Sequence, residues 1–491
     1  MAARADGALL DLPWRAPLSE WPDSIVEALP RGISRHIVRF VRVDGRILAI
    51  KEIGQPVAAH EYGMLRDLMR LNAPCVEPLA VISGRVDSRG EPLNAALVTE
   101  HLPYSLPYRA LFGKHQRPAT IRRLIDALSV LMVRLHLLGF FWGDVSLSNT
   151  LFRRDAGEFA AYLVDAETGE LYDHLTDGKR EYDIDVARTN IIGELMDLQA
   201  GRLLPSDYDT IEVGNSFSQR YHDLWDDLTM ESSFSADERW KVEERIERLN
   251  NLGFEVGEIT ISADLNGARL SVQPKVVDAG HYSRKIMRLT GMDVQENQAR
   301  RLINDIQQYR VMTDRAAVPQ TVIAHDWMTH VFQPTINAVP AELMGKLEPA
   351  ELFHQILDHR WFISEQAGRD IPTEEAVASF VENILRHQRD ERSFLGPTSG
   401  DTDYVVTPTG PSAITPTGAS ARTPSEGTAF TPPGGTPSSG NTAPSGNAAS
   451  GRGSARTGLL PRCPAGGLHT PSPQRLPGRH TGGSHTTWTE A

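Results

Sequence analysis

The chain has 491 residues, 40% of them hydrophobic, and its formal net charge is −13. This length allows two or three domains, and the negative charge disfavours nucleic acid as a general partner. Two cysteines, Cys75 and Cys463, are too few for a disulfide framework. Neither a secretory leader nor an apolar run of membrane-spanning length is found. We therefore expect a soluble, cytoplasmic protein with a sizeable core and no transmembrane segment.

Two strands and a helix are predicted near the start of the chain. Residues 36–43 and 46–53 alternate apolar and polar side chains, and Asp44-Gly45 between them predicts a tight hairpin turn. Residues 56–71 follow with a helical pattern. Further on, residues 93–102 have the pattern of a buried strand that runs into a polar linker.

Lys51 stands out because the chain has 43 arginines and seven lysines, and no other lysine precedes Lys114. A site that requires a compact point charge would retain lysine, although a single lysine is also compatible with chance. The predicted ion-pair partner is Glu61 on the following helix, since Glu52 points to the opposite face of the strand. The alternative for Glu61 is an ordinary surface charge.

The richest motif follows a predicted amphipathic helix over residues 118–138. Gly143-Asp144 is followed by Asn149 five residues after the aspartate, and Asp165 ends a short Leu-Val-Asp strand. This spacing is typical of phosphoryl-transfer sites. The reaction needs a carboxylate for the acceptor hydroxyl and oxygen ligands for Mg²⁺. The Gly-Asp-x4-Asn pattern by itself also arises by chance.

With these motifs, residues 24–205 resemble the protein-kinase-like superfamily, most closely the lipopolysaccharide kinase (Kdo/WaaP) type. That type also has a His-x-x-Gly segment before the Gly-Asp-x4-Asn motif, and His136-Leu-Leu-Gly139 is the equivalent here. Residues 10–390 resemble a bacterial, mainly actinobacterial, family in which such a module precedes a helical domain of unknown function. The resemblance implies an α+β, bilobal protein-kinase-like fold. Its expected parts are an N-lobe (24–105), a C-lobe (106–205), a mainly helical domain (206–392) and a disordered tail (393–491).

The resemblance implies ATP and Mg²⁺ as cofactors. Lys51 would bind the α- and β-phosphates, and Glu61 would hold Lys51 in place. Backbone groups between Glu100 and Leu102 would meet the edge of the adenine. An ATP-dependent kinase of this type would act on the hydroxyl of an unknown acceptor.

The same resemblance assigns the catalytic and metal positions. Asp144 would be the catalytic base, and Asn149 and Asp165 would be Mg²⁺ ligands. Asp183 and Asp185 are predicted to begin a helix. One of them would brace the catalytic loop, or both are ordinary carboxylates near a helix N-terminus.

Four features depart from the protein-kinase pattern. The segment Leu29–Ser34 offers one glycine in place of a glycine-rich loop, and Trp142 stands where a histidine is usual. Asp165-Ala166-Glu167 replaces Asp-Phe-Gly. We expect Glu167 to be a solvated carboxylate, and the alternative is a further metal ligand. No long activation segment follows, which favours a small-molecule, lipid or saccharide acceptor.

The region 206–392 is less informative. A charged helix is predicted over 236–251, two strands over 256–263 and 268–276, and helices over 280–310, 319–334, 341–368 and 373–388. We expect its polar and aromatic cluster to serve packing or surface roles: His325, Asp326, His330, His354, His359 and Trp361. This domain would select the acceptor, mediate dimerisation or bind a protein partner.

The tail from Leu395 to Ala491 is rich in Gly, Pro, Ser, Thr and Ala, so it cannot offset the entropy of folding. Thr-Pro recurs every eight residues from Thr407 to Thr431, as in a row of phosphorylation sites or a drifted repeat. The tail holds six arginines and four acidic residues, which leaves −15 on the rest.

Two functions from different classes fit these patterns. The first is an ATP- and Mg²⁺-dependent phosphotransferase, which the intact set of Lys51, Asp144, Asn149 and Asp165 favours. The second is a pseudokinase that acts as a nucleotide-binding or scaffolding module, which the single glycine of Leu29–Ser34 favours. A nucleic-acid-binding protein does not fit the charge of the chain.

Overall fold

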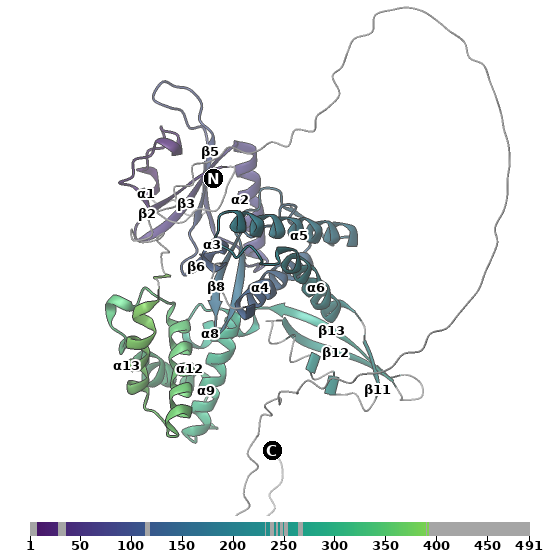
Figure 1. Cartoon of the computed structure of the whole chain (residues 1–491), viewed down its shortest axis with the longest axis vertical. Coiled ribbons are helices and arrows are strands. Elements are labelled where there is room, and N and C mark those ends of the chain that lie inside the picture. The colour runs from purple at the N-terminus through teal and green to yellow at the C-terminus, as the bar shows by residue number, and fades with distance from the viewer. Residues whose placement is uncertain are drawn as a thin grey trace, which may run out of the picture. The chain divides into compact units, whose positions relative to one another are not determined.

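The structure is a computed structural model. The residues it describes are 7–27, 36–112, 118–230, 232–235, 240–241, 244–245, 249, 254–263, 269–388 and 390–391. An N-terminal sheet lobe, a helical second lobe and a further helical region confirm the predicted α+β, kinase-like class (Figure 1). The segment Leu29–Ser34 and the tail from residue 393 lie outside the described residues.

The N-lobe is built on one five-stranded antiparallel sheet. In spatial order its strands are β1 (Val26–Glu27), β2 (Ile37–Val43), β3 (Arg46–Ile53), β5 (Ala95–Glu100) and β4 (Pro78–Ile82). Asp44 and Gly45 both have positive φ, as a two-residue hairpin turn requires, so the predicted β2–β3 hairpin is confirmed. Helix α2 (Gln55–Arg70) packs on strands β4 and β5.

The alternation of β3 decides where Lys51 points. Leu48 and Ile50 pack in one apolar cluster with the N-terminal segment, whereas Ile53 packs in another cluster with Tyr62 of α2. Lys51 shares the parity of Ile53, and it therefore points toward α2. Glu52 points the other way, as predicted, and accepts a hydrogen bond from the Arg85 guanidinium.

The C-lobe is organised around the predicted central helix, which the structure confirms as α4 (Pro118–Leu137). The chain leaves α4 through Gly139, whose φ is +81°, and a Cβ there would collide with the carbonyl oxygen of Tyr172. The other elements of the lobe are β6 (Ser105–Pro107), α3 (Tyr108–Leu111), β7 (Phe140–Phe141), β8 (Thr150–Asp155), β9 (Glu158–Leu163), β10 (Glu170–Leu171), α5 (Asp177–Ala200) and α6 (Thr210–Thr229).

Helices α5 and α6 differ from what the sequence predicted for the C-lobe. Helix α5 begins at Asp177, six residues before Asp183, so the prediction that Asp183 and Asp185 begin a helix was wrong. Helix α6 follows residue 205, the predicted end of the lobe, yet its Phe217 and Tyr221 are part of the core shared with α4 and α5. The domain boundaries stay a prediction.

The region beyond α6 combines a small sheet with helices. Strands β11 (Ser232–Ser235), β13 (Arg269–Ala279) and β12 (Phe254–Ala263) pair antiparallel, which confirms the two predicted strands. The turn between β12 and β13, and most of the predicted helix 236–251, lie outside the described residues. The helices are α8 (His281–Thr290), α9 (Glu296–Met312), α10 (Gln320–Trp327), a π-helical turn (Met328–Phe332), α11 (Gln333–Asn337), α12 (Pro349–Ala367) and α13 (Thr373–Asn383).

These last helices surround a core of their own, which includes Trp327, Phe332, Phe353 and Phe380. The single pattern over 280–310 is two helices, because α8 ends at Gly291 with φ +77°. No helix in the described part of the chain is both long and apolar enough to cross a membrane.

His354 of α12 is a packed residue of this region. Its ring is 4% exposed, and Nε2 lies 3.3 Å from the carbonyl oxygen of Gln298. Burial lowers the pKa of His354 from 6.5 to about 4, although the charge of Glu351 opposes this shift. The imidazole is therefore neutral in the folded protein near pH 7.

Replacing His354 with Gln should reduce the acid sensitivity of folding. Below pH 6.5 the imidazole of His354 is protonated in the unfolded chain, whereas in the folded chain it stays neutral down to about pH 4. The stability that His354 contributes is therefore lost as the pH falls through that window. At about pH 5 the wild type should have lost ~2 kcal/mol more than His354→Gln, relative to about pH 7.5.

Urea unfolding at the two pH values measures this difference. The exposed His325→Gln, in the same domain, is the control for the loss of an imidazole outside the core. Equal pH dependence of His354→Gln and the wild type would contradict the assignment of a neutral, buried imidazole.

Candidate functional site

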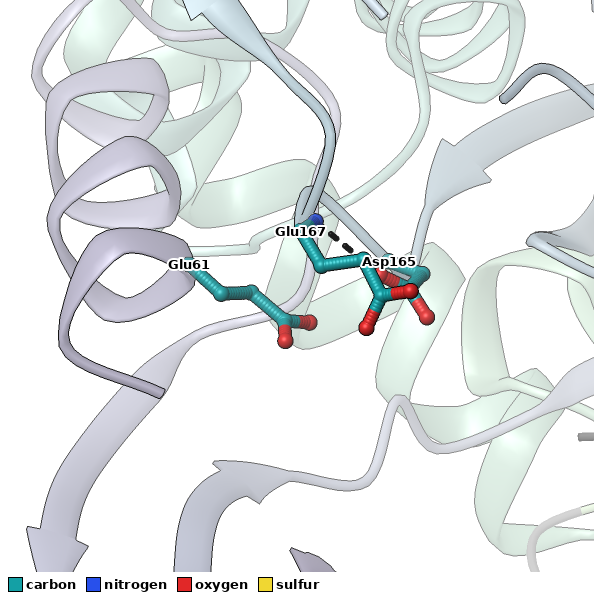
Figure 2. A group of neighbouring side chains, drawn as sticks. All are labelled: Glu61, Asp165 and Glu167. Carbon is teal, nitrogen blue, oxygen red and sulfur yellow. Dashed lines mark hydrogen bonds between the residues drawn. The ribbon is translucent and has the colours of Figure 1, made fainter. Parts of the chain in front are cut away.

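The ammonium of Lys51 lies among three carboxylates from both lobes. Its Nζ is 2.6 Å from Asp165 Oδ2, 3.1 Å from Glu61 Oε2 and 3.1 Å from Glu167 Oε2. Glu61 reaches in from α2, whereas Asp165 and Glu167 follow β9, and Figure 2 shows the three carboxylates turned toward one another. The structure thus brings together three of the predicted site residues: Lys51, Glu61 and Asp165.

Burial and charge act against each other in this cluster. Burial alone would lower the pKa of Lys51, but the charges of Glu61, Asp165 and Glu167 raise it above its usual value. Burial raises the pKa of Glu61 to about 8, and the Asp165 charge adds to this rise while Lys51 opposes it. Glu61 is 1% exposed, so the alternative of an ordinary surface charge is wrong.

Glu167 was expected to be a solvated carboxylate, and that expectation was wrong. Its side chain is 12% exposed and lies 3.0 Å from His36 Nε2 as well as against Lys51. Its backbone N–H donates to Asp165 Oδ1 at 3.0 Å, a bond drawn in Figure 2. Sequence reasoning missed His36, which gave no signal beyond its place at the start of β2.

One face of α5 holds the backbone of residues 142–149, the segment with Asp144 and Asn149, which is called the catalytic loop here after its expected role. Asp183 accepts hydrogen bonds from the backbone N–H groups of Trp142 (2.8 Å) and Gly143 (2.7 Å). Glu194 does the same for Leu147 (2.7 Å) and Ser148 (2.9 Å). The predicted brace by one of the two aspartates is confirmed for Asp183.

Asn190 adds a third contact from the same helix, because its Nδ2 donates to the Val145 carbonyl at 2.8 Å. Positions 183, 190 and 194 share one face of a helix by their spacing of seven and four. Burial raises the pKa of Glu194, and hydrogen bonds from the loop oppose the rise. Sequence reasoning missed Asn190 and Glu194, although their helical spacing from Asp183 was a usable signal.

Asp183 is itself held in place by His136. His136, of the predicted His-x-x-Gly approach, lies 3.2 Å from Asp183 Oδ2 through Nε2 and 2.7 Å from the Tyr221 hydroxyl through Nδ1. Burial lowers the pKa of His136, so the neutral ring donates to Asp183 and accepts from Tyr221. Helix α6 thus supports the catalytic loop through Tyr221.

Trp142, the residue at the usual histidine position, links the loop to Asp165. The expectation that Asp165 ends a strand was wrong, because β9 ends at Leu163. Its indole Nε1 donates to the Asp165 carbonyl oxygen at 2.8 Å, and its own carbonyl accepts from Thr168 Oγ1 at 2.7 Å. The indole is fully buried. A histidine is therefore not required to fix the backbone at Asp165, because the tryptophan donor does so.

Asp144 and Asn149 lie on the loop as the motif implies. Asn149 Nδ2 donates to the Asp144 carbonyl at 3.0 Å, which leaves the amide Oδ1 as the oxygen ligand that this side chain can offer. The Asn149 carbonyl accepts from Val164 N–H at 3.0 Å, next to Asp165. Asp144 is partly exposed.

Glu100 and Leu102 lie at the junction of the two lobes. Glu100 ends β5, and its carboxylate is 3.3 Å from the guanidinium of Arg46. The Leu102 carbonyl accepts from Ser105 Oγ at 2.7 Å, which shapes the turn into the C-lobe. The contact of their backbone groups with adenine stays a prediction.

Among the described residues, one group of carboxylates is close enough to hold a metal ion: Glu61, Asp165 and Glu167. The polar and aromatic residues of the helical domain form no such group within the described part of the chain.

Comparison with known proteins gives two family matches. Residues 42–188 match the lipopolysaccharide kinase (Kdo/WaaP) family, and residues 223–385 match a domain of unknown function (DUF4032). These matches confirm the resemblance stated from the motifs. A solved structure, WaaP in complex with acyl carrier protein, is similar with 16% identity and a TM-score of 0.30, over 47% of this chain and 90% of that chain. No curated protein matches the sequence.

Replacing Asp183 with Ala should destabilise the protein by about 3 kcal/mol, because two buried backbone N–H groups lose their acceptor. Denaturant unfolding of the wild type and the variant measures this loss. Asp185→Ala is a matched control: it lies two residues along α5, is exposed, and should change stability by no more than about 0.5 kcal/mol. Equal losses for the two variants would contradict the bracing role of Asp183.

Proposed function

We propose that residues 42–188, the part with the lipopolysaccharide kinase match, act as an ATP- and Mg²⁺-dependent phosphotransferase. The observation that carries the proposal is the triple contact of Lys51 with Glu61, Asp165 and Glu167. It places one cation, held by Glu61 of an N-lobe helix, beside the carboxylate of Asp165, which lies two residues after the end of β9. Phosphoryl transfer requires this combination of a cation and a metal-binding carboxylate.

The donor chemistry at the site fits Mg²⁺, which takes oxygen ligands. Asp165 offers a carboxylate, and Asn149 offers its amide Oδ1 while its Nδ2 is committed to the Asp144 carbonyl. We assign these two residues as the ligands. When bound, the metal would neutralise charge on the triphosphate.

The remaining roles belong to protein groups. Lys51 would contact the α- and β-phosphates, with Glu61 limiting the positions its ammonium can take. Asp144 would orient the acceptor hydroxyl and accept its proton. Backbone groups from Glu100 to Leu102 would bind the adenine edge, which leaves the nucleotide between the two lobes.

The acceptor is proposed to be a hydroxyl of a small molecule, lipid or saccharide. Residues 166–176 alone separate Asp165 from α5, and part of that segment is the short strand β10, paired with β7. A peptide-docking activation segment has no room there. The name of the matched family adds weight to a saccharide-bearing acceptor.

A pseudokinase is the second candidate, and one observation favours it. Lys51 is enclosed by three carboxylates, so phosphates must compete with these groups for its ammonium. A chain that binds nucleotide without turnover would function as a nucleotide-dependent scaffold. The region 206–392 would then recruit a protein partner.

Calorimetric titration of ATP, with and without Mg²⁺, tests the nucleotide site. Wild-type protein should bind ATP more tightly when Mg²⁺ is present. In Asp165→Asn this Mg²⁺-dependent increase in ATP affinity should be about tenfold smaller, which corresponds to ~1.4 kcal/mol of binding free energy. Asp173→Asn is the matched control, because Asp173 is an exposed aspartate of the same segment. Absence of ATP binding to the wild type would sink the proposal.

Replacing Asp144 with Asn separates the enzyme from the pseudokinase. ATP should bind the variant as tightly as the wild type, since Asp144 is assigned to the acceptor and not to the nucleotide. Slow ATP hydrolysis, with water as the acceptor, should fall by about 10²- to 10⁴-fold. If the wild type binds ATP but its hydrolysis is undetectable or unaffected by the substitution, the pseudokinase is the better description.

A further inference from the structure

The two proposed metal ligands lie at the open end of one β-hairpin. Strand β8 begins at Thr150, directly after Asn149, and β9 ends at Leu163, two residues before Asp165. Val164 N–H donates to the Asn149 carbonyl at 3.0 Å and closes this end of the hairpin. The relative position of the two ligands therefore depends on how the hairpin is held.

The far end of the hairpin is a strained turn. Ala156 and Gly157 have φ values of +53° and +93°, and the left-handed conformation is unfavourable for alanine. The structure retains it because the buried Ala156 N–H donates to Glu351 Oε2 at 2.8 Å. Glu351 belongs to α12 of the helical domain, so that domain supplies the acceptor for the turn.

A reciprocal contact runs from the hairpin to the helical domain. The Asp155 carboxylate accepts from the backbone N–H groups of Asn297 (3.2 Å) and Gln298 (2.8 Å), in the first turn of α9. It thus caps a helix that belongs to the other domain. Gln298 Nε2 in turn donates to the Arg154 carbonyl at 3.0 Å and to Glu351 Oε2 at 3.2 Å.

Charged side chains of β8 continue this junction. Arg153 pairs with Glu348 at 2.7 Å, and Arg154 pairs with Glu391 through two of its nitrogens. Glu348 and Glu391 are largely buried, so these are not solvent-screened surface pairs. Every residue from 153 to 156 thereby has a polar contact with the helical domain.

We propose that the helical domain sets the position of the Mg²⁺ ligands by holding the β8–β9 hairpin at its turn, with Glu351 and Asp155 as positioning residues. A short β-hairpin is only marginally stable by itself, and the strained Ala156 turn needs an external acceptor. The hairpin transmits its placement to Asn149 and Asp165 at the other end. This inference rests on the proposed function, because it assigns those two residues as metal ligands.

Hydrogen-exchange mass spectrometry of the nucleotide-free full chain tests the mechanical part. Glu351→Ala removes the acceptor of Ala156 N–H, and exchange should quicken about tenfold both at the turn and at the catalytic end, residues 143–149 and 164–169. Glu351→Gln retains an oxygen acceptor and should restore slow exchange. Glu375→Ala is the matched control, since Glu375 is exposed and pairs with Arg369 inside the helical domain.

ATP titration of the same variants tests the link to the metal. Glu351→Ala should reduce the Mg²⁺-dependent gain in ATP affinity about tenfold and leave Mg²⁺-free ATP binding unchanged, which a loss of stability alone would not do. Glu351→Gln and Glu375→Ala should behave as wild type. Arg154→Met, a milder change at the same junction, should act in the same direction if Glu351→Ala does not fold.

The outcomes separate the two proposals. Unchanged exchange at residues 143–149 and 164–169, or an unchanged Mg²⁺-dependent gain, would overturn the positioning role and leave the junction as a simple domain contact. A wild type that fails to bind ATP would overturn the proposed function. Quickened exchange at the catalytic end would still support the hold on the hairpin in that case.

Discussion

The site depends first on the backbone N–H groups of the catalytic loop. A loop that carries Asp144 and Asn149 is neither helix nor strand, so its buried amides need acceptors from elsewhere. Asp183 and Glu194 supply these acceptors from one face of α5. Because α5 is packed on α6 and α6 on α4, the core of the C-lobe holds the loop, in addition to the hydrogen bonds within the loop itself.

The second constraint is electrostatic. Glu61, Asp165 and Glu167 approach one another closely, which is unfavourable for like charges unless a cation lies among them. Lys51 is that cation, and it draws the helix of the N-lobe and the end of β9 together. Burial and the neighbouring charge of Asp165 both raise the pKa of Glu61, and the ammonium of Lys51 opposes this rise.

The helical domain is joined to the kinase-like part by hydrogen bonds that each part donates to the other. Asp155 caps α9, and Glu351 of α12 holds the turn that follows Asp155. Each side therefore supplies acceptors for backbone N–H groups of the other. The hairpin that makes these contacts also carries the residues assigned to the metal. The two regions that match families, 42–188 and 223–385, are therefore in direct contact.

Much of the site was predictable because local patterns decide it. The period-two alternation of 46–53 placed Lys51 on the side of α2, and the five-residue spacing of Asp144 and Asn149 placed both on one loop. Apolar periodicity located α2, α4 and the β2–β3 hairpin. These features depend on residues close in sequence, and steric rules act on them wherever they occur.

Tertiary structure alone decided the rest. The spacing of Glu194 from Asp183 puts it on the same helix face, but only the folded chain brings it to Leu147 and Ser148. Glu167 was misjudged because its burial depends on His36 and Lys51. The capping of α9 by Asp155 joins residues of two domains. Hydrogen-bond acceptors and burial are set by whichever chain segments meet in space. The sequence determined which groups are candidates for the chemistry, and packing determined which groups hold them in place.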